Sequence, residues 1–241
     1  MSFALYNRQS AGLRFWTQEE ILIREQAIAR LLEAVSRPLL DLNSAWRFER
    51  VETPVMMPRE DFSCAYDSSD IFELAGVVGD KPFALRAETT PGTYLIAEHL
   101  LKSTKMRGPI CFWQAGPSFR RESSDGATSE KLRFNQFWQL EFQCLYPEDS
   151  KADYATPVRE SVRVAVEKLV GTDARLIESD RLPAYATETI DIEAIWKGDW
   201  KEVASTSKRT DFPEINGAKK LTCFEVALGL DRLVAITNQE A

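Results

Sequence analysis

The chain has 241 residues, of which 44% are hydrophobic and 28% are charged. This balance favours a folded globular protein, and the length suffices for one large domain or two small ones. No apolar run approaches the roughly 20 residues that cross a bilayer, and the first residues lack the layout of a signal peptide, so a cytoplasmic protein is expected. The formal net charge of −7 does not indicate a nucleic-acid partner, although it does not exclude one.

An amphipathic helix is predicted near the start of the chain. Thr17 and Glu20 form a capping-box pattern ahead of residues 21–40, whose apolar positions have helical spacing. Proline lacks the backbone donor that a helix interior needs, so we expect this helix to end near Pro38.

The next two segments combine strand and helix patterns. Residues 47–58 alternate as one strand, in which Pro54 and Pro58 suit a sheet edge or an interface because they donate no ladder hydrogen bond. Residues 81–101 indicate a strand, a Pro-Gly turn at 91–92, and then a helix.

Two aromatic-rich runs, 108–122 and 133–146, flank a polar segment that contains Gly126, which is typical of an antiparallel hairpin with a long loop. Further on, the patterns predict a helix over 155–171, strands at 190–196 and 200–206, and a strand that turns through Gly229 into a helix within 222–236. No repeat or linker interrupts this order. We therefore predict a single α+β domain over residues 1–241, an antiparallel β-sheet flanked by helices.

Cysteine and histidine are scarce. Cys64, Cys111, Cys144 and Cys223 stand far apart among apolar neighbours, without the close spacing of zinc or redox motifs, so buried thiols are expected. The one histidine, His99, argues against zinc chemistry and against Ser-His-Asp hydrolysis.

The predicted hairpin concentrates charged and aromatic side chains. Arg120 and Glu122 can share one face, with Arg133 and Phe137 opposite them. Two facing arginines repel unless an anion lies between them, and a polyphosphate fits because guanidinium groups bind phosphate oxygens in pairs. A nucleotide base could stack on Phe137. Alternatively, the arginines pair with neighbouring carboxylates and Phe137 belongs to the core.

Three motifs resemble those of class II aminoacyl-tRNA synthetases, and they follow one another along the chain in the order of that family. "FERVETPVMMP" resembles motif 1 with Pro54 in the proline position, and "FRRE", a loop and "RFNQF" resemble motif 2. "EVALGLDRL" resembles motif 3 with Arg232 as its arginine. Within the class, "LRAETTPG", "LPAYATETIDIE" and "WKEVASTSKRTDF" resemble segments of glycyl-tRNA synthetase. The resemblance runs from about residue 15 to 236 and implies the class II catalytic-domain fold.

The resemblance implies an ATP site with magnesium. Arg120 would hold the α-phosphate and the amino-acid carboxylate, Glu122 the adenine amino group, and Phe137 would stack on adenine. Arg133 and Arg232 would bind the terminal phosphates. Glu225 would hold Mg²⁺ and, with Arg120 and Arg232, take part in catalysis.

The resemblance also implies an amino-acid site. Glu141 and Glu202 match acidic residues that bind the ammonium group, and a strand-turn element with Glu88 and Thr89 lies near the same pocket. The full set expected there is Arg86, Glu88, Thr89, Glu141, Glu202 and Ala227. For Glu141, a salt bridge to Arg120 or Arg133 remains an alternative.

Several positions depart from the glycyl pattern. Ala227 replaces a serine that helps define the glycine pocket, and Val226 replaces the preceding proline. Ala87, Ala184 and Ile190 replace a proline, a histidine and a tryptophan. The substrate is therefore expected to be a small amino acid, with alanine and serine as rivals to glycine.

Arg232 lies nine residues before the last residue, so no anticodon-binding domain is expected within the chain. Three functions compete. One is an enzyme that forms an aminoacyl-adenylate and passes the aminoacyl group to a carrier protein, a small molecule or tRNA. Another is a glycyl-type core that charges tRNA through its acceptor stem, and the third is a non-catalytic accessory protein. A homodimer through the motif 1 region around Pro54 is expected in each.

Overall fold

A seven-stranded sheet forms the centre of the protein. The computed structural model describes residues 13–62, 66–67, 69–78, 81–103, 108–122, 126–127, 131–215 and 220–238. The strand order is β1-β5-β6-β10-β9-β8-β7, with β1 parallel to β5 and all other neighbours antiparallel. The strands are β1 (Arg47–Arg50), β5 (Ile110–Phe119), β6 (Gln136–Pro147), β7 (Ala174–Glu178), β8 (Ala186–Trp196), β9 (Asp199–Arg209) and β10 (Leu221–Gly229). The predicted fold class is confirmed.

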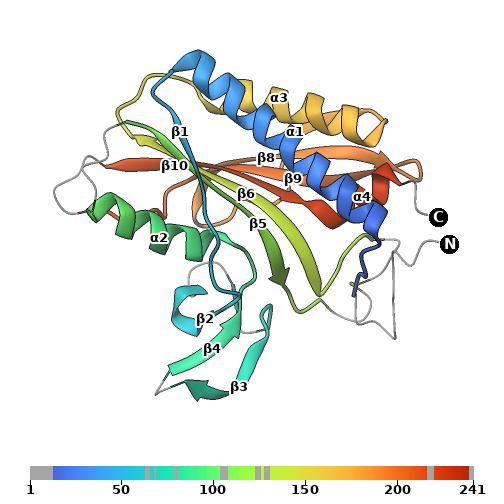
Figure 1. Cartoon of the computed structure of the whole chain (residues 1–241), viewed down its shortest axis with the longest axis horizontal. Helices are drawn as coiled ribbons and strands as arrows, with labels where there is room; N and C mark the ends of the chain where they lie inside the picture. Colours follow the sequence, from blue (N-terminus) through green and yellow to red (C-terminus); the bar gives the residue numbers. More distant parts are fainter. Residues whose placement is uncertain are drawn as a thin grey trace.

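Helices cover both faces of this sheet (Figure 1). Helices α1 (Gln18–Leu42), α3 (Ala155–Val170) and α4 (Leu230–Thr237) pack together on one face, and α2 (Thr90–Ser103) lies against the other. A small sheet, β2-β4-β3, stands apart below α2 in the figure and comprises β2 (Met56–Pro58), β3 (Glu73–Val78) and β4 (Lys81–Leu85), with the 3-10 turn η1 (Arg59–Phe62) beside it. None of the helices in the described residues is long and apolar enough to span a membrane.

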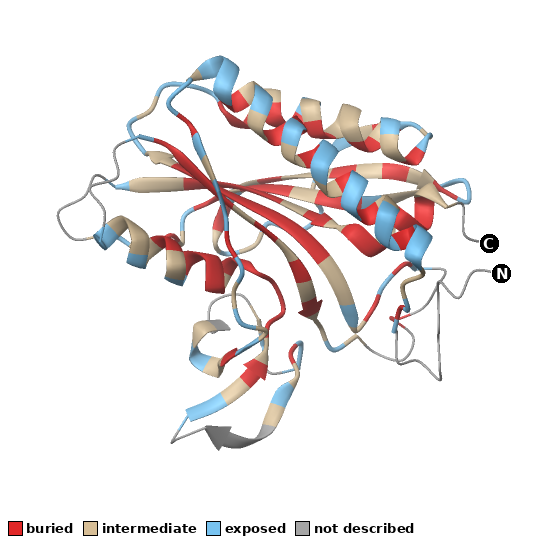
Figure 2. Cartoon of the chain, viewed as in Figure 1, coloured by how far each residue is buried: buried red, intermediate tan, exposed pale blue. Residues whose placement is uncertain are grey.

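The main core lies between the large sheet and α1, α3 and α4. Along β10, Phe224, Val226 and Leu228 are buried in this core. Side chains alternate along a strand, so Glu225 and Ala227 face the opposite side of the sheet. Figure 2 shows the same division on the helices, whose buried residues face the sheet. The sheet face away from α1 and α3 is therefore free to carry polar groups.

Helix α1 begins as predicted and ends later. The Thr17 hydroxyl accepts from the Glu20 N–H at 3.3 Å, and Glu20 Oε2 accepts from the Thr17 N–H at 2.7 Å, which is a capping box. The helix continues through Pro38 to Leu42, so its predicted end was wrong. The buried side chain of Leu39 packs in the main core, and this packing outweighs the hydrogen bond that Pro38 cannot make.

Residues 47–58 do not form one strand. The chain leaves the large sheet after Val51, whose N–H donates to Trp113 O at 2.9 Å, and joins the small sheet only at Met56. Between them, the Thr53 N–H donates to a side chain, Oε1 of Gln114, at 3.3 Å, and Pro54 has no N–H to donate. The predicted Pro-Gly turn at 91–92 instead lies in the first turn of α2, where proline is well tolerated.

Candidate functional site

A cavity of about 800 Å³ lies on the sheet face that α1 and α3 leave open. Strands β6, β9 and β10 contribute its floor through Glu141, Ser205, Ser207 and Glu225, and residues 179–185 supply one side. The alternation of each strand places these polar side chains on one face while their neighbours fill the core. The sheet thus gathers charged groups from segments far apart in the sequence.

Two glutamates on adjacent strands, Glu141 and Glu225, are buried in the floor. Oε2 of Glu141 accepts from the Thr89 N–H at 2.9 Å and from the Thr89 hydroxyl. Oε2 of Glu225 accepts from the Thr90 hydroxyl at 2.8 Å and from Nη1–H of Arg209 at 2.7 Å. The start of α2 and an arginine of β9 therefore hold both carboxylates in place.

A third buried glutamate, Glu88, lies beside them in the segment between β4 and α2. Its Oε2 accepts from the Tyr66 hydroxyl at 2.9 Å. Its Oε1 is buried without a hydrogen-bond partner, and Nη1 of Arg209 lies 3.6 Å away. Burial raises the pKa of Glu88, with Glu225 adding to the rise and Arg209 opposing it. Burial and the neighbouring carboxylates of Glu225 and Glu88 likewise raise the pKa of Glu141, to about 7.

The positive charge beside these three carboxylates does not balance their negative charge. Such a group is costly to bury unless a further cation joins it, since Arg209 is shared among Glu88, Glu225 and Asp211. A substrate ammonium has the charge and the three donors that the arrangement lacks.

Arg120, directly after β5, adjoins the glutamates. Its Nε–H donates to Ala87 O at 3.2 Å and its Nη2–H donates to the Tyr66 hydroxyl at 2.9 Å. The guanidinium carbon lies 5.2 Å from the centre of the Phe137 ring and 5.4 Å from that of Tyr66. Burial alone would lower the pKa of Arg120, but Tyr66 and the nearby carboxylates outweigh it and raise the pKa. A permanent cation therefore sits against an aromatic face in the cavity wall.

Arg120 and Arg133 were predicted to face each other across the hairpin, but Arg133 pairs with a carboxylate instead. Arg133 is exposed, and its Nη1 lies 3.7 Å from Oε2 of Glu122, so for this arginine the alternative of pairing with a neighbouring carboxylate holds. Phe137, the expected adenine platform, is partly buried and lines the cavity rather than the core. Both arginines still line the same cavity as Glu122.

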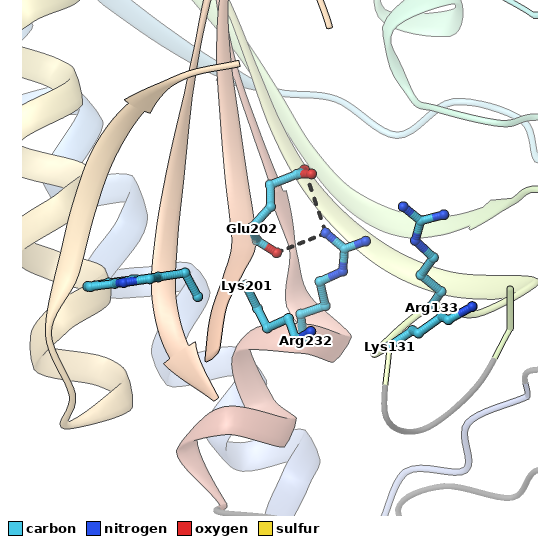
Figure 3. Close-up of a pocket in the computed structure, with 6 residues that line it drawn as sticks. Lys131, Arg133, Lys201, Glu202 and Arg232 are labelled. Carbon is cyan, nitrogen blue, oxygen red and sulfur yellow. Dashed lines mark hydrogen bonds and ion pairs between the residues drawn. The ribbon is translucent and has the colours of Figure 1, made fainter. Parts of the chain in front are cut away.

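A cationic recess of about 300 Å³ adjoins the cavity and shares Arg133, Glu202 and Arg232 with it (Figure 3). Arg133 and Lys131 stand on one side of the recess, and Arg232 and Lys201 on the other. Four cations around one carboxylate fit a ligand with several negative charges, such as a polyphosphate.

Arg232 is fixed from two directions. Its Nε–H donates to Leu132 O at 3.0 Å, and its Nη1–H donates to Glu202 O at 2.8 Å, with Oε1 of Glu202 at 3.6 Å. Glu202 therefore lies with Arg232 where the recess meets the cavity, and its side chain is half exposed. Its predicted contact with the ammonium does not follow from this position.

The remaining predicted residues differ in their distance from the cavity. Ala227 lines it and pairs with Glu141 on one side and Ser205 on the other. Thr89 acts through Glu141. Arg86 does not line the cavity, because its Nε–H donates to Pro117 O at 2.8 Å and its Nη1–H to Thr53 O at 2.8 Å.

Pro54 is exposed between β1 and β2, and the role of its region in a dimer stays a prediction. Cys111, Cys144 and Cys223 are buried free thiols as predicted, while Cys64 lies outside the described residues.

The assignment of magnesium to Glu225 stays a prediction. Oε2 of Glu225 already accepts from the guanidinium of Arg209 and from the Thr90 hydroxyl, so protein donors engage this oxygen. Among the described residues, no group of three or more metal-ligating side chains is arranged to hold a metal ion. Magnesium often needs only one or two carboxylates when phosphates and water supply the rest. The half-exposed carboxylate of Glu202, in the cationic recess, is accessible to such an ion.

Arg209 and Tyr66 were not among the predicted site residues. Arg209 shares its face of β9 with Ser205 and Ser207, so strand alternation around "STSKR" was the available signal. Arg209 also donates to both carboxylate oxygens of Asp211, at 3.0 and 2.6 Å, which holds it beneath the glutamates. Tyr66 follows η1 in an irregular segment that carries no periodic signal.

Comparisons with known proteins agree with this fold. The sequence profile described as "tRNA synthetase class II core domain (G, H, P, S and T)" matches residues 76–240. The glycine--tRNA ligase of Clostridium tetani (strain Massachusetts / E88) is 27% identical over 171 residues, which is 62% of this chain and 36% of that protein. The glycine--tRNA ligase of Staphylococcus aureus (strain JH9) gives the same identity and coverage. The matched part of the chain thus spans about a third of the length of these curated relatives.

Solved structures show the fold independently. Prolyl-tRNA synthetase from Cryptosporidium parvum, complexed with halofuginone and AMPPNP, superimposes with a TM-score of 0.75 at 12% identity, over 98% of this chain and 51% of that one. Cytoplasmic serine-tRNA ligase from Naegleria fowleri, in complex with AMP, gives a TM-score of 0.70 at 15% identity, over 92% of this chain and 49% of that one. The chain belongs to the family of class II tRNA synthetase core domains.

Proposed function

We propose that this protein activates a small amino acid with ATP, forming an aminoacyl-adenylate and pyrophosphate, and then transfers the aminoacyl group to an acceptor. The observation that carries the proposal is the order of charges in one cavity. Three buried glutamates, Glu88, Glu141 and Glu225, adjoin the guanidinium of Arg120, and a recess of further cations adjoins the same cavity. An ammonium, a carboxylate next to an α-phosphate, and a polyphosphate follow one another in the same order during amino-acid activation.

The proposed reaction needs positioning and charge stabilisation more than a proton-transfer residue. A carboxylate oxygen of the amino acid attacks the α-phosphorus, and the bond from that phosphorus to the bridging oxygen of pyrophosphate breaks. Arg120 stabilises the charge at the α-phosphate, while Arg232 and Arg133 bind the departing pyrophosphate. Phe137 stacks on adenine and Glu122 accepts from its amino group. AMPPNP and AMP in the two related structures accord with adenine-nucleotide binding in this fold.

Magnesium bound to the triphosphate would neutralise part of its charge. We propose Glu202 as its protein ligand, because this carboxylate is half exposed in the recess proposed for the polyphosphate, whose negative charge offsets the neighbouring cations. Glu225 contributes to the ammonium site instead, since Arg209 and Thr90 occupy its Oε2.

The small size of the substrate rests on the residues around Ala227. Ser205 and Glu141 are its partners across the sheet, so Ala227 lies between a serine and one of the glutamates proposed to bind the ammonium. Where glycyl-tRNA synthetase has a serine, Ala227 leaves slightly more room, and glycine, alanine and serine are the candidate substrates. A pocket discriminates one methylene by only about 1–3 kcal/mol, so this substitution is enough to change the preference.

A tRNA acceptor is the second candidate for the transfer step, and the similarity to the two glycine--tRNA ligases favours it. A carrier protein or small molecule is the alternative acceptor. A non-catalytic accessory role finds less support, because a cluster of buried, mutually repelling carboxylates destabilises the fold unless it binds a ligand.

Exchange of labelled pyrophosphate into ATP, measured with each of the twenty amino acids, tests the proposal. Exchange with one small amino acid, lost in Arg120→Ala and retained in the surface variant Lys168→Ala, is the expected result. Absence of exchange with all twenty would reject amino-acid activation by this chain. Transfer of the activated amino acid to bulk tRNA then separates the two acceptors.

A further inference from the structure

One hydroxyl group joins the two oppositely charged parts of the cavity. The Tyr66 hydroxyl accepts from Nη2–H of Arg120 at 2.9 Å and donates to Oε2 of Glu88 at 2.9 Å. The phenol therefore uses both its donor and an acceptor site, which fixes the orientation of its O–H bond. The Arg120 guanidinium also lies 5.4 Å from the centre of the Tyr66 ring, so ring and hydroxyl contact the same cation.

This contact fixes one oxygen of Glu88. Tyr66 donates to Oε2, whereas Oε1 is buried without a hydrogen-bond partner and lies 3.6 Å from Nη1 of Arg209. On the other side, Arg120 gives Nε–H to Ala87 O and Nη2–H to Tyr66, which leaves its remaining N–H groups for an anion. The tyrosine thus links a buried carboxylate to a guanidinium that retains N–H groups for a ligand.

We infer that Tyr66 is a positioning residue that holds Glu88 and Arg120 at the spacing of an α-amino-acid zwitterion and so couples amino-acid binding to ATP binding. The inference rests on the proposed function for the identity of the ligand. The ammonium binds the carboxylate of Glu88, and the amino-acid carboxylate lies against Arg120, beside the α-phosphate. A hydrogen-bonded chain of ionised and polar groups strengthens as each end is bound, so each substrate favours the other.

The hydrogen bonds that join Arg120, Tyr66 and Glu88 also affect the protonation of Glu88. The hydrogen bond from Tyr66 lowers the pKa of Glu88, against the larger effect of burial. The charged or titratable groups that face Glu88 from the surrounding elements are Arg120 after β5, Glu141 on β6, Arg209 on β9, Glu225 on β10, and Tyr185. Loss of the Tyr66 hydroxyl leaves all of these in place, so the pKa of Glu88 should rise and the ionised form should appear only at higher pH.

The variant Tyr66→Phe tests the inference, since it keeps the ring and removes the hydroxyl. In pyrophosphate exchange we expect the KM for the amino acid to rise about tenfold or more, because the lost hydrogen bonds involve charged groups. We expect the KM for ATP at limiting amino acid to change less. The acid limb of kcat/KM for the amino acid should move to higher pH, which a purely structural role would not cause. Tyr146→Phe, which removes a hydroxyl from a partly buried residue packed against the main core, is the matched control.

A second measurement is independent of activity. Carbon-13 NMR of labelled glutamate side chains, with the Glu88 signal assigned by its loss in Glu88→Gln, reports the pKa of Glu88 directly. A higher pKa in Tyr66→Phe than in the unmodified protein is expected. An unchanged pKa, or an unchanged KM and pH profile in an active enzyme, would overturn the inference. If the unmodified protein shows no exchange, the proposed function fails, while the titration still decides whether Tyr66 controls Glu88.

Discussion

Arg209 donates Nη1–H to Oε2 of Glu225 at 2.7 Å, and both side chains are almost fully buried. The same nitrogen lies 3.6 Å from Oε1 of Glu88, so one guanidinium serves two carboxylates. Its other N–H groups donate to Asp211, and its plane lies 3.9 Å from the centre of the Tyr185 ring. Arg209 is therefore the fixed cation of a cluster that is otherwise acidic, and the remaining deficit of positive charge makes the cluster a binding site.

Removal of this cation should destabilise the fold strongly. Arg209→Ala leaves buried glutamates without their partner, and breaking a buried ion pair in this way costs about 3–5 kcal/mol. Urea unfolding measures the change in the free energy of unfolding. Lys208→Ala, at the next position of β9, is the control, because the pair of Lys208 with Glu188 is partly exposed and contributes less than about 1 kcal/mol. Similar unfolding midpoints for the two variants would contradict the role given to Arg209.

Amino-acid affinity should depend on pH near neutrality. Burial and the adjacent carboxylates raise the pKa of Glu141 to about 7, and only its ionised form attracts an ammonium. The KM for the amino acid should therefore rise as the pH falls below 7, by about tenfold per unit well below the pKa. Steady-state exchange between pH 5.5 and 8.5 measures this dependence. A KM that stays constant over that range would exclude Glu141 as a titrating ligand.

Stability should show the opposite dependence. The pKa of Glu141 is higher in the folded protein than the ordinary value of 4.5, so the folded state binds more protons between these two values. The free energy of unfolding should therefore fall as the pH rises from about 4.5 to 7. Glu141→Gln should reduce this slope in urea unfolding at a series of pH values. A slope equal to that of the unmodified protein would show that other groups cause it.

Two glycines allow the segment after β1 to pack closely on the hairpin and on α2. A Cβ atom at Gly92 would lie 2.6 Å from Oγ1 of Thr53, and one at Gly116 would lie 2.4 Å from Nη2 of Arg86. Arg86 in turn donates to Thr53 O, so both substitutions disturb the same junction. Gly92→Ala and Gly116→Ala should each cost about 1–3 kcal/mol of stability.

Thermal unfolding compares these variants with Gly229→Ala, whose new methyl group would meet nothing closer than 3.8 Å. A melting temperature for Gly92→Ala equal to that for Gly229→Ala would show that the residues around Gly92 accommodate the methyl group without loss of stability.

Nucleotide affinity should depend on the ring of Phe137. Phe137→Leu retains an apolar side chain but removes the flat face beside Arg120, and stacking of a base on an aromatic residue contributes about 1–3 kcal/mol. We expect the Kd for AMPPNP, measured by calorimetry, to rise about tenfold. Phe48→Leu, on the edge strand β1, provides a comparison. Equal nucleotide affinity in the two variants would place adenine elsewhere.

The elements with a clear period were predictable. The hairpin of β5 and β6, helix α3 and the strand-to-helix unit of β10 and α4 appear where the patterns indicate them. Arg120 and Arg232 line one cavity although more than a hundred residues separate them, because motif order fixes their place in the fold. Strands β3 and β7 are short and were not predicted, and the end of α1 was wrong because tertiary packing overrides the proline at position 38.

The site was predictable only in part. Glu88, Glu141 and Arg120 were expected from the motifs, yet the motifs do not reveal which carboxylates share a cation. Contacts across the sheet decide this. They bring Arg209 to Glu225 and place Glu202 at the recess with Arg232. The sequence around Tyr66 has no periodic pattern, and its hydrogen bonds to Glu88 and Arg120 join residues more than twenty positions away.

Binding of a stable aminoacyl-adenylate analogue, the aminoacyl-sulfamoyl adenosine of the amino acid that supports exchange, or of glycine, alanine and serine in turn, tests the proposed chemistry most directly. One cavity that holds the ammonium, Arg120 and adenine together should bind the analogue at least 100-fold more tightly than ATP, as expected for a ligand that resembles the intermediate. Arg120→Ala and Glu88→Gln should remove most of this gain. Binding of all three analogues no tighter than that of adenosine would contradict the proposed site.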